Sequence, residues 1–106
     1  MTRLDRSFHA LADPTRRAVL AQLTGGEASV SQLAEPFAVS LPTFLAHLRV
    51  LEEGGLIHTR KQGRVRLCRL ATGGYAPLQE WLEAQRQLWE GRSDRLAEFV
   101  TREPES

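Results

Sequence analysis

The stretch of sequence that most restricts the fold is residues 40–70, where a short helix leads directly into a two-stranded ribbon. Ser40 has the chemistry of a helix N-cap, and a pair of glycines ends the helix-periodic segment that follows it. Residues 57–61 and 64–70 are rich in branched apolar and basic side chains, and the Gln-Gly pair at 62–63 predicts the hairpin turn between them. A helix and a ribbon joined this closely form one rigid unit.

The helix that Ser40 caps has two different faces at the helical spacing of about 100° per residue. The side chains of its inward face are Phe44, His47, Leu48 and Leu51. The outward side chains are Pro42, Ala46, Arg49 and Glu53, flanked by Thr43 and Leu45. The outward face is therefore small or apolar over its first half.

Three shorter helices are predicted upstream. Residues 4–12 carry apolar side chains at helical spacing, and Asp13 followed by Pro14 is an N-cap with proline in the first turn. Ser29 and Gln32 have the spacing of a capping box and begin a third helix, joined to the next helix by a short turn. Two such consecutive helices form a helix-turn-helix. The predicted fold is mainly α with a small β-hairpin, a winged helix-turn-helix with four helices, two strands and a long last helix.

The last helix is predicted over residues 77–100, about 36 Å in length. One of its faces is apolar and carries both tryptophans, and the first 70 residues are too few to cover it. Because large aromatic side chains dominate interface energetics, we expect this face and the first helix to pair two copies of the chain. The alternative is that both tryptophans complete the core of a single chain. The predicted dimer interface consists of Leu4, Phe8, Leu78, Trp81, Leu82, Gln85, Trp89 and Leu96.

Charge is divided unevenly along the chain. The net charge is only +1, but residues 1–70 hold ten basic and six acidic side chains, whereas residues 71–106 hold four and seven. Residues 57–70 contain five basic side chains and no acidic one. A cationic ribbon beside a helix-turn-helix favours double-stranded DNA as the partner. The alternative is a solvated hairpin whose charges only discourage pairing between sheet edges.

The predicted DNA-binding residues come from both parts of this unit. The helix-turn-helix supplies Ser29, Ser31, Gln32, Ser40, Pro42, Thr43, Leu45, Ala46 and Arg49, the first three at a helix N-terminus suited to an anion. The ribbon supplies Arg60, Lys61, Gln62, Arg64 and Arg66. We expect the basic residues of the ribbon to contact phosphates.

Composition argues against several other classes of protein. A single cysteine forms neither an internal disulfide nor a Cys-based metal cluster. The longest apolar runs are short, so we expect a cytoplasmic protein without membrane contact. Neither a Ser/His/Asp or Cys/His set nor a Gly-rich phosphate loop is apparent, so we expect no enzyme and no cofactor. Residues 1–106 are expected to form one DNA-binding domain, with residues 77–100 as its dimerisation helix.

Several motifs together resemble the ArsR/SmtB-type winged-helix transcriptional repressors along nearly the whole chain. These motifs are Leu11-Ala12-Asp13-Pro14-Thr15-Arg16-Arg17 with Leu20, Val30-Ser31-Gln32-Leu33-Ala34, Ser40 with Pro42, His47-Leu48 with Leu51, Gly55-Leu56-Ile57, Gly63-Arg64, Trp81-Leu82 and Trp89. The resemblance implies a homodimer held mainly by the first and last helices. It also implies binding to a roughly palindromic operator and repression of transcription until an inducer releases the protein.

The chain departs from the metal-sensing members of this family. Where those members commonly carry a Cys-x-Cys motif, this chain has Ser29 and Ser31, and residues 77–100 contain no histidine. Serine hydroxyls are poor ligands for thiophilic ions. We therefore expect a repressor without a metal site that is not controlled by metal.

A second departure concerns the recognition helix, which in the family usually presents polar residues at the positions of Leu41, Leu45 and Ala46. Leucine and alanine only touch thymine methyl groups or fill space, so hydrogen-bonded base contacts would rest on Thr43 and Arg49. These apolar side chains also motivate an alternative, a protein-interaction module that has lost operator binding.

Three further residues carry expectations. We expect His47 to be a structural histidine bonded to backbone, and Arg16 and Arg17 to form salt bridges at the surface or an interface. Cys68 is expected to be a small buried residue rather than a redox switch. The sequence does not identify the signal that releases the protein from DNA. The main expectation is a repressor not controlled by metal, and the alternative is the same fold regulated by a small organic ligand or by oxidation of Cys68.

Overall fold

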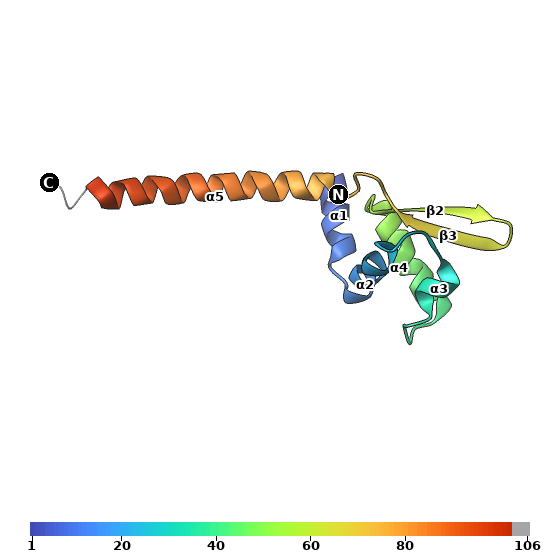
Figure 1. Ribbon diagram of the computed structural model, residues 1–106. Coiled ribbons are helices and arrows are strands. Elements are labelled where there is room, and N and C mark those ends of the chain that lie inside the picture. Colours follow the sequence, from blue (N-terminus) through green and yellow to red (C-terminus); the bar gives the residue numbers. More distant parts are fainter. Residues whose placement is uncertain (103–106) are drawn as a thin grey trace.

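The computed structural model describes the backbone of residues 1–102 and the side chains of residues 1–91. A small head of helices and strands carries one long helix that projects away from it (Figure 1). The elements in chain order are α1 Arg3–Leu11, α2 Pro14–Leu23, β1 Ala28–Ser29, α3 Val30–Ala34, α4 Leu41–Glu53, β2 Ile57–Gln62, β3 Val65–Leu70 and α5 Ala76–Arg102. The predicted winged helix-turn-helix is confirmed.

The helices begin where side chains satisfy their first backbone N–H groups. Asp13 accepts a hydrogen bond from the Arg16 backbone N–H at 3.1 Å and caps α2. At α3 the capping box is complete, since Ser29 Oγ accepts from the Gln32 backbone N–H and the Gln32 side chain accepts from the Ser29 N–H. Ser40 Oγ accepts from the Thr43 N–H and caps α4. These three predicted helix starts are confirmed.

The sheet has three strands in the order β1-β3-β2, one more than the sequence predicted. The extra strand, β1, is only two residues long and pairs antiparallel with β3, placing Ala28 opposite Cys68. The predicted hairpin turn at residues 62–63 is wrong by one position, because Gln62 pairs with Val65 and leaves Gly63 and Arg64 as the loop. Gly63 has a φ of +62°, which glycine tolerates at the first position of a two-residue hairpin loop.

One apolar core lies between the helices and the sheet. Its most buried large side chains are Leu33, Phe44, Leu51, Leu56 and Ile57. Leu78 of α5 is only 4% exposed and belongs to this core, so it offers little area to a partner copy and is better assigned to the protomer than to the predicted dimer interface. The core fixes α4 against the sheet and leaves its outward face free.

The long helix α5 leaves the head on the side opposite to the β2–β3 hairpin, which we call the wing (Figure 1). It starts at Ala76 and extends to Arg102, slightly longer at both ends than the predicted residues 77–100. Its first turns lie against α1. Within the described part of the chain, no helix has both the length and the apolar character needed to span a membrane.

Candidate nucleic-acid interface

The outward face of α4 is exposed, as the helical spacing predicted. Pro42, Thr43, Leu45, Ala46 and Arg49 are all exposed, whereas Phe44, Leu48 and Leu51 are buried. One complete face of α4 is therefore accessible to a ligand, and the N-terminal half of that face is mainly apolar.

The polar residues at the two helix starts are partly occupied by capping. Ser29 and Gln32 bond each other's backbone N–H groups, and Ser40 Oγ donates to Thr43 Oγ1 at 3.0 Å while accepting from the Thr43 N–H. Ser31 is exposed beside them. Capping is therefore one role of Ser29, Gln32 and Ser40.

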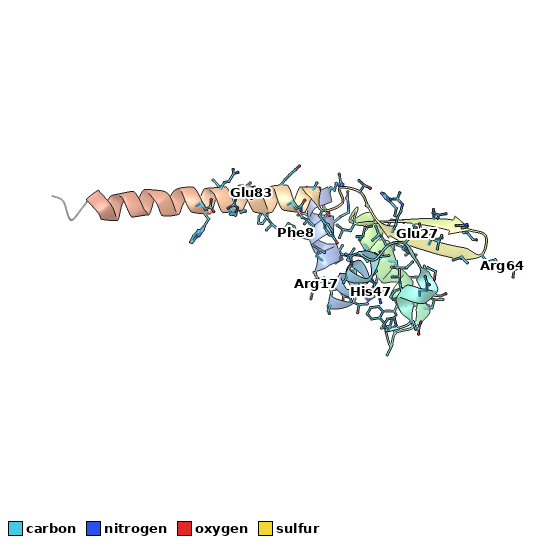
Figure 2. The ribbon with its side chains drawn as sticks, viewed as in Figure 1. Phe8, Arg17, Glu27, His47, Arg64 and Glu83 are labelled. Atoms are coloured by element: carbon cyan, nitrogen blue, oxygen red, sulfur yellow. The ribbon has the colours of Figure 1, made fainter. Side chains whose placement is uncertain are left out.

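The wing presents its basic side chains at the tip. Lys61, Gln62 and Arg64 are exposed, and Arg64 points outward from the loop end (Figure 2). Among the described residues, neither Lys61 nor Arg64 has a salt-bridge partner. These two cations are therefore available to a phosphate backbone.

Residues 57–70 contain no acidic side chain, but an acid from elsewhere in the chain lies against the wing. Arg60 forms an ion pair with Glu27 at 2.9 Å, and its Nη1 also donates to Gln62. Glu27 lies 33 positions earlier in the chain, so the charge run within residues 57–70 gave no sign of it. Arg60 is therefore a weaker candidate for phosphate contact than Lys61 or Arg64.

Arg66 is tied to α4 through a chain of side chains. Its Nη1 donates to Thr59 Oγ1 at 3.2 Å, and the Thr59 hydroxyl and backbone N–H both donate to a carboxylate oxygen of Glu52. Glu52 is thus an acid beside the wing that accepts hydrogen bonds from β2. This chain of bonds fixes the wing relative to α4, so that both can meet one rigid ligand.

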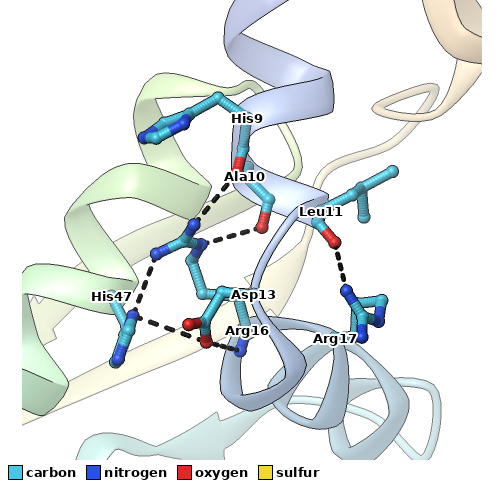
Figure 3. Close-up of polar contacts among 7 residues, drawn as sticks. All are labelled: His9, Ala10, Leu11, Asp13, Arg16, Arg17 and His47. Carbon is cyan, nitrogen blue, oxygen red and sulfur yellow. Dashed lines mark hydrogen bonds and ion pairs between the residues drawn. The ribbon is translucent and has the colours of Figure 1, made fainter.

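Arg16 is the centre of a buried polar cluster that joins α1, α2 and α4 (Figure 3). Its Nε donates to Ala10 O at 2.8 Å, and its Nη2 donates to His9 O at 3.0 Å. Its Nη1 lies 3.0 Å from Nδ1 of His47 on α4. Arg16 is buried, so its predicted place in a surface or interface salt bridge is wrong. Arg17 is exposed and donates to Leu11 O.

The prediction that His47 bonds to the backbone is wrong, because its Nδ1 contacts the side chains of Arg16 and Asp13. Because a guanidinium group only donates, His47 Nδ1 accepts from Arg16, which places the proton of the neutral ring on Nε2. Asp13 Oδ2 lies 3.8 Å from the same Nδ1. Partial burial acts to raise the pKa of Asp13, but hydrogen bonds from the backbone N–H groups of Arg16 and Thr15 and the positive charge of Arg16 lower it, and the lowering prevails. The cluster ties the recognition helix to the first two helices.

The first turns of α5 and the outer face of α1 form an exposed apolar surface. Phe8 and Trp81 meet edge to face with ring centroids 5.5 Å apart, yet Trp81 remains 43% exposed and Trp89 68% exposed. The members of this surface, which we call the α1–α5 face, are Phe8, Trp81, Leu82, Gln85, Leu88 and Trp89. Of the other predicted interface residues, Leu4 packs against the core, and the side chain of Leu96 lies outside the described residues.

Cys68 is fully buried in β3, as the sequence predicted. Burial raises the pKa of its thiol, and nearby Arg66 only partly opposes this effect. Since the thiolate is the reactive form, both burial and protonation argue against Cys68 as a switch.

We expect native Cys68 to react with a disulfide reagent such as Ellman's reagent at least about 100-fold more slowly than in denaturant, because the β-sheet must open first. Absorbance of the released thiolate measures both rates on the same sample. Equal rates would show that the thiol is accessible and would restore oxidation as a signal.

Comparison with known proteins finds similarity to helix-turn-helix transcriptional regulators. A helix-turn-helix domain model matches residues 11–60. The HTH-type transcriptional regulator Rv2034 of Mycobacterium tuberculosis is 39% identical over 74% of this chain and 74% of its own length. The transcriptional repressor SdpR of Bacillus subtilis is 34% identical over 58% of this chain and 68% of its own length.

Solved structures agree with these sequence relatives. The crystal structure of an ArsR family transcriptional regulator is 50% identical and has a TM-score of 0.80, covering 83% of this chain and 91% of that one. The homodimeric winged helix-turn-helix DNA-binding domain of a possible ArsR-family regulator from Mycobacterium bovis is 29% identical, with a TM-score of 0.64 over 80% of this chain and 79% of that one. Such proteins are DNA-binding regulators and not enzymes. The chain belongs to the ArsR family of winged helix-turn-helix transcriptional regulators.

Proposed function

We propose that the protein is a homodimeric, cytoplasmic transcriptional repressor that binds a roughly palindromic DNA operator. Each protomer sets α4 in the major groove and places the tip of its wing, with Lys61 and Arg64, against the adjacent backbone. The observation that carries the proposal is the pair of exposed cations, Lys61 and Arg64, held beside the exposed outward face of α4 by the Arg66–Thr59–Glu52 bonds.

The α1–α5 face supports the dimer. It exposes two tryptophans on one side of a helix whose opposite side carries the paired charges of Arg86 with Glu83 and Glu90. A similar protein is described as a homodimeric domain. Two-fold pairing through this face directs the two α4 helices to half-sites about 34 Å apart on one duplex.

The residues do not fit the Cys-x-Cys metal site of metal-sensing relatives. Ser29 and Ser31 stand at the positions of the two cysteines, and the Ser29 hydroxyl already accepts the Gln32 N–H as a cap. Hydroxyl groups bind thiophilic ions poorly. This supports control by something other than metal, such as a small organic inducer.

The double change Lys61→Ala with Arg64→Ala tests the role of the wing. We expect operator affinity at about 0.1 M salt to fall at least tenfold, and the log–log salt slope to become shallower by about 3 to 4 units, because four phosphate contacts per dimer are lost. Fluorescence anisotropy on a duplex selected from genomic fragments measures both quantities.

The matched control is Arg17→Ala with Arg86→Ala, which removes the same charge from α2 and α5 and should leave the slope within about one unit of the unchanged protein. If the wing and control variants bind alike, the wing is not part of the interface.

One observation favours a second candidate function, a protein-interaction module. Leu41 and Leu45 are exposed on α4 and give its N-terminal half an apolar surface that suits a protein partner. This candidate predicts that no duplex is retained from a genomic selection at low salt. A retained duplex excludes it as the only function.

A further inference from the structure

The N-terminal half of α4 and the start of β3 together expose an apolar surface. Leu41 is 56% exposed, Leu45 is 37% exposed and Val65 of the wing is 47% exposed. All three line one groove between α3, α4 and the wing. The apolar side chains thus meet across two elements far apart in sequence, which the helical pattern of α4 alone did not predict.

Polar and basic groups border this groove. Ser29 and Ser31 lie along its α3 side, and Arg64 and Arg66 lie along its wing side. None of the residues that line the groove is acidic. The nearby acid, Glu52, lines an adjoining hollow and accepts hydrogen bonds from Thr59. The groove therefore suits a ligand that places an anionic group beside Arg64 and Arg66 and an apolar group against the leucine and valine side chains.

The α1–α5 face and this groove lie on opposite sides of the head, since α5 leaves the head away from the wing and α3 (Figure 1). A second copy of the chain paired through α5 would not cover Leu41, Leu45 or Val65. The charge of Arg64 and Arg66 is complementary to a phosphate backbone. Of the groups on base edges in the major groove, only the thymine C5-methyl is apolar.

We propose that Leu41, Leu45 and Val65 read thymine methyl groups, so that each operator half-site carries thymines where the N-terminal half of α4 enters the major groove. This inference rests on the proposed function. Leu45 is the central reader, because it lines both this groove and the adjoining hollow with Arg49. Burying a methyl group against leucine stabilises the complex without any hydrogen bond to the base.

The test compares thymine with deoxyuridine, which differs only by the absent methyl group, at each thymine of a selected half-site. We expect deoxyuridine in place of the thymine that contacts Leu45 to weaken binding of the unchanged protein about fourfold, which is the effect of one buried methyl group. Leu45→Ala should bind the thymine duplex more weakly and lose this discrimination. Anisotropy titrations at fixed salt measure each affinity.

Arg64→Ala is the matched control, since it should weaken binding to both duplexes equally and keep the fourfold ratio. If deoxyuridine binds as well as thymine at every position, or if selected half-sites lack thymine, the methyl readout is wrong while DNA binding stands. If no duplex is bound at all, the proposed function itself fails. Retention of the ratio in Leu45→Ala, Leu41→Ala and Val65→Ala alike would also overturn the assignment.

Discussion

Replacing Arg16 with alanine is expected to lower the free energy of unfolding by about 3 kcal/mol. The change removes three hydrogen bonds of a buried guanidinium group and leaves Ala10 O without its 2.8 Å donor. It also frees His47 on α4 from its contact with α2. Because small domains are stable by only about 5–15 kcal/mol, this is a large fraction of the total.

Denaturant unfolding at one fixed protein concentration measures this loss, since dimer stability depends on concentration. Arg16→Lys keeps the charge but not the forked donor geometry, so it should recover only part of the loss. The neighbouring Arg17→Ala removes an exposed side chain with one hydrogen bond and should cost no more than about 0.5 kcal/mol. Equal losses in Arg16→Ala and Arg17→Ala would contradict the role of the buried cluster.

The second large effect is expected at the α1–α5 face. Trp81→Ala combined with Trp89→Ala should raise the dissociation constant of the dimer at least about 100-fold, because truncating a buried interface tryptophan commonly costs about 2 kcal/mol or more. Both rings are substantially exposed in the single chain and thus have area to bury. Light scattering over a dilution series measures the dissociation.

Trp89→Ala alone distinguishes an effect on the dimer interface from an effect on the stability of the head. Trp81 also contacts Phe8 within the protomer, whereas Trp89 lies about two turns further along α5. The matched control is Gln87→Ala on the opposite side of the helix, where the exposed side chain donates a hydrogen bond to Glu83. A dimer that persists unchanged in the double tryptophan variant would place the interface elsewhere.

Much of the fold followed from local sequence signals. Asp13 before Pro14, the Ser29–Gln32 box and Ser40 each satisfy a helix start through residues three positions apart, so their chemistry is visible in sequence. Strand β1 was missed because two residues carry no periodic pattern. Its pairing of Ala28 with Cys68 is set by the tertiary fold.

The exposed outward face of α4 and the exposed wing tip followed from the sequence, but the ion pairing of the wing did not. Glu27 and Arg60 are 33 residues apart, so the ion pair that neutralises the base of the wing has no local signature. The burial of Arg16 was missed for a related reason. Its partner His47 is 31 residues away, and an arginine beside another arginine gives no indication of which one turns inward.

The central claim is that two protomers, paired through α5, hold one DNA duplex across their wings. Sedimentation equilibrium of the protein with a selected duplex carrying both half-sites tests this claim most directly. We predict a complex of two protomers per duplex, and a loss of that complex in the double tryptophan variant at concentrations where the unchanged protein is fully bound. A complex of one protomer per duplex with unchanged affinity would contradict the account.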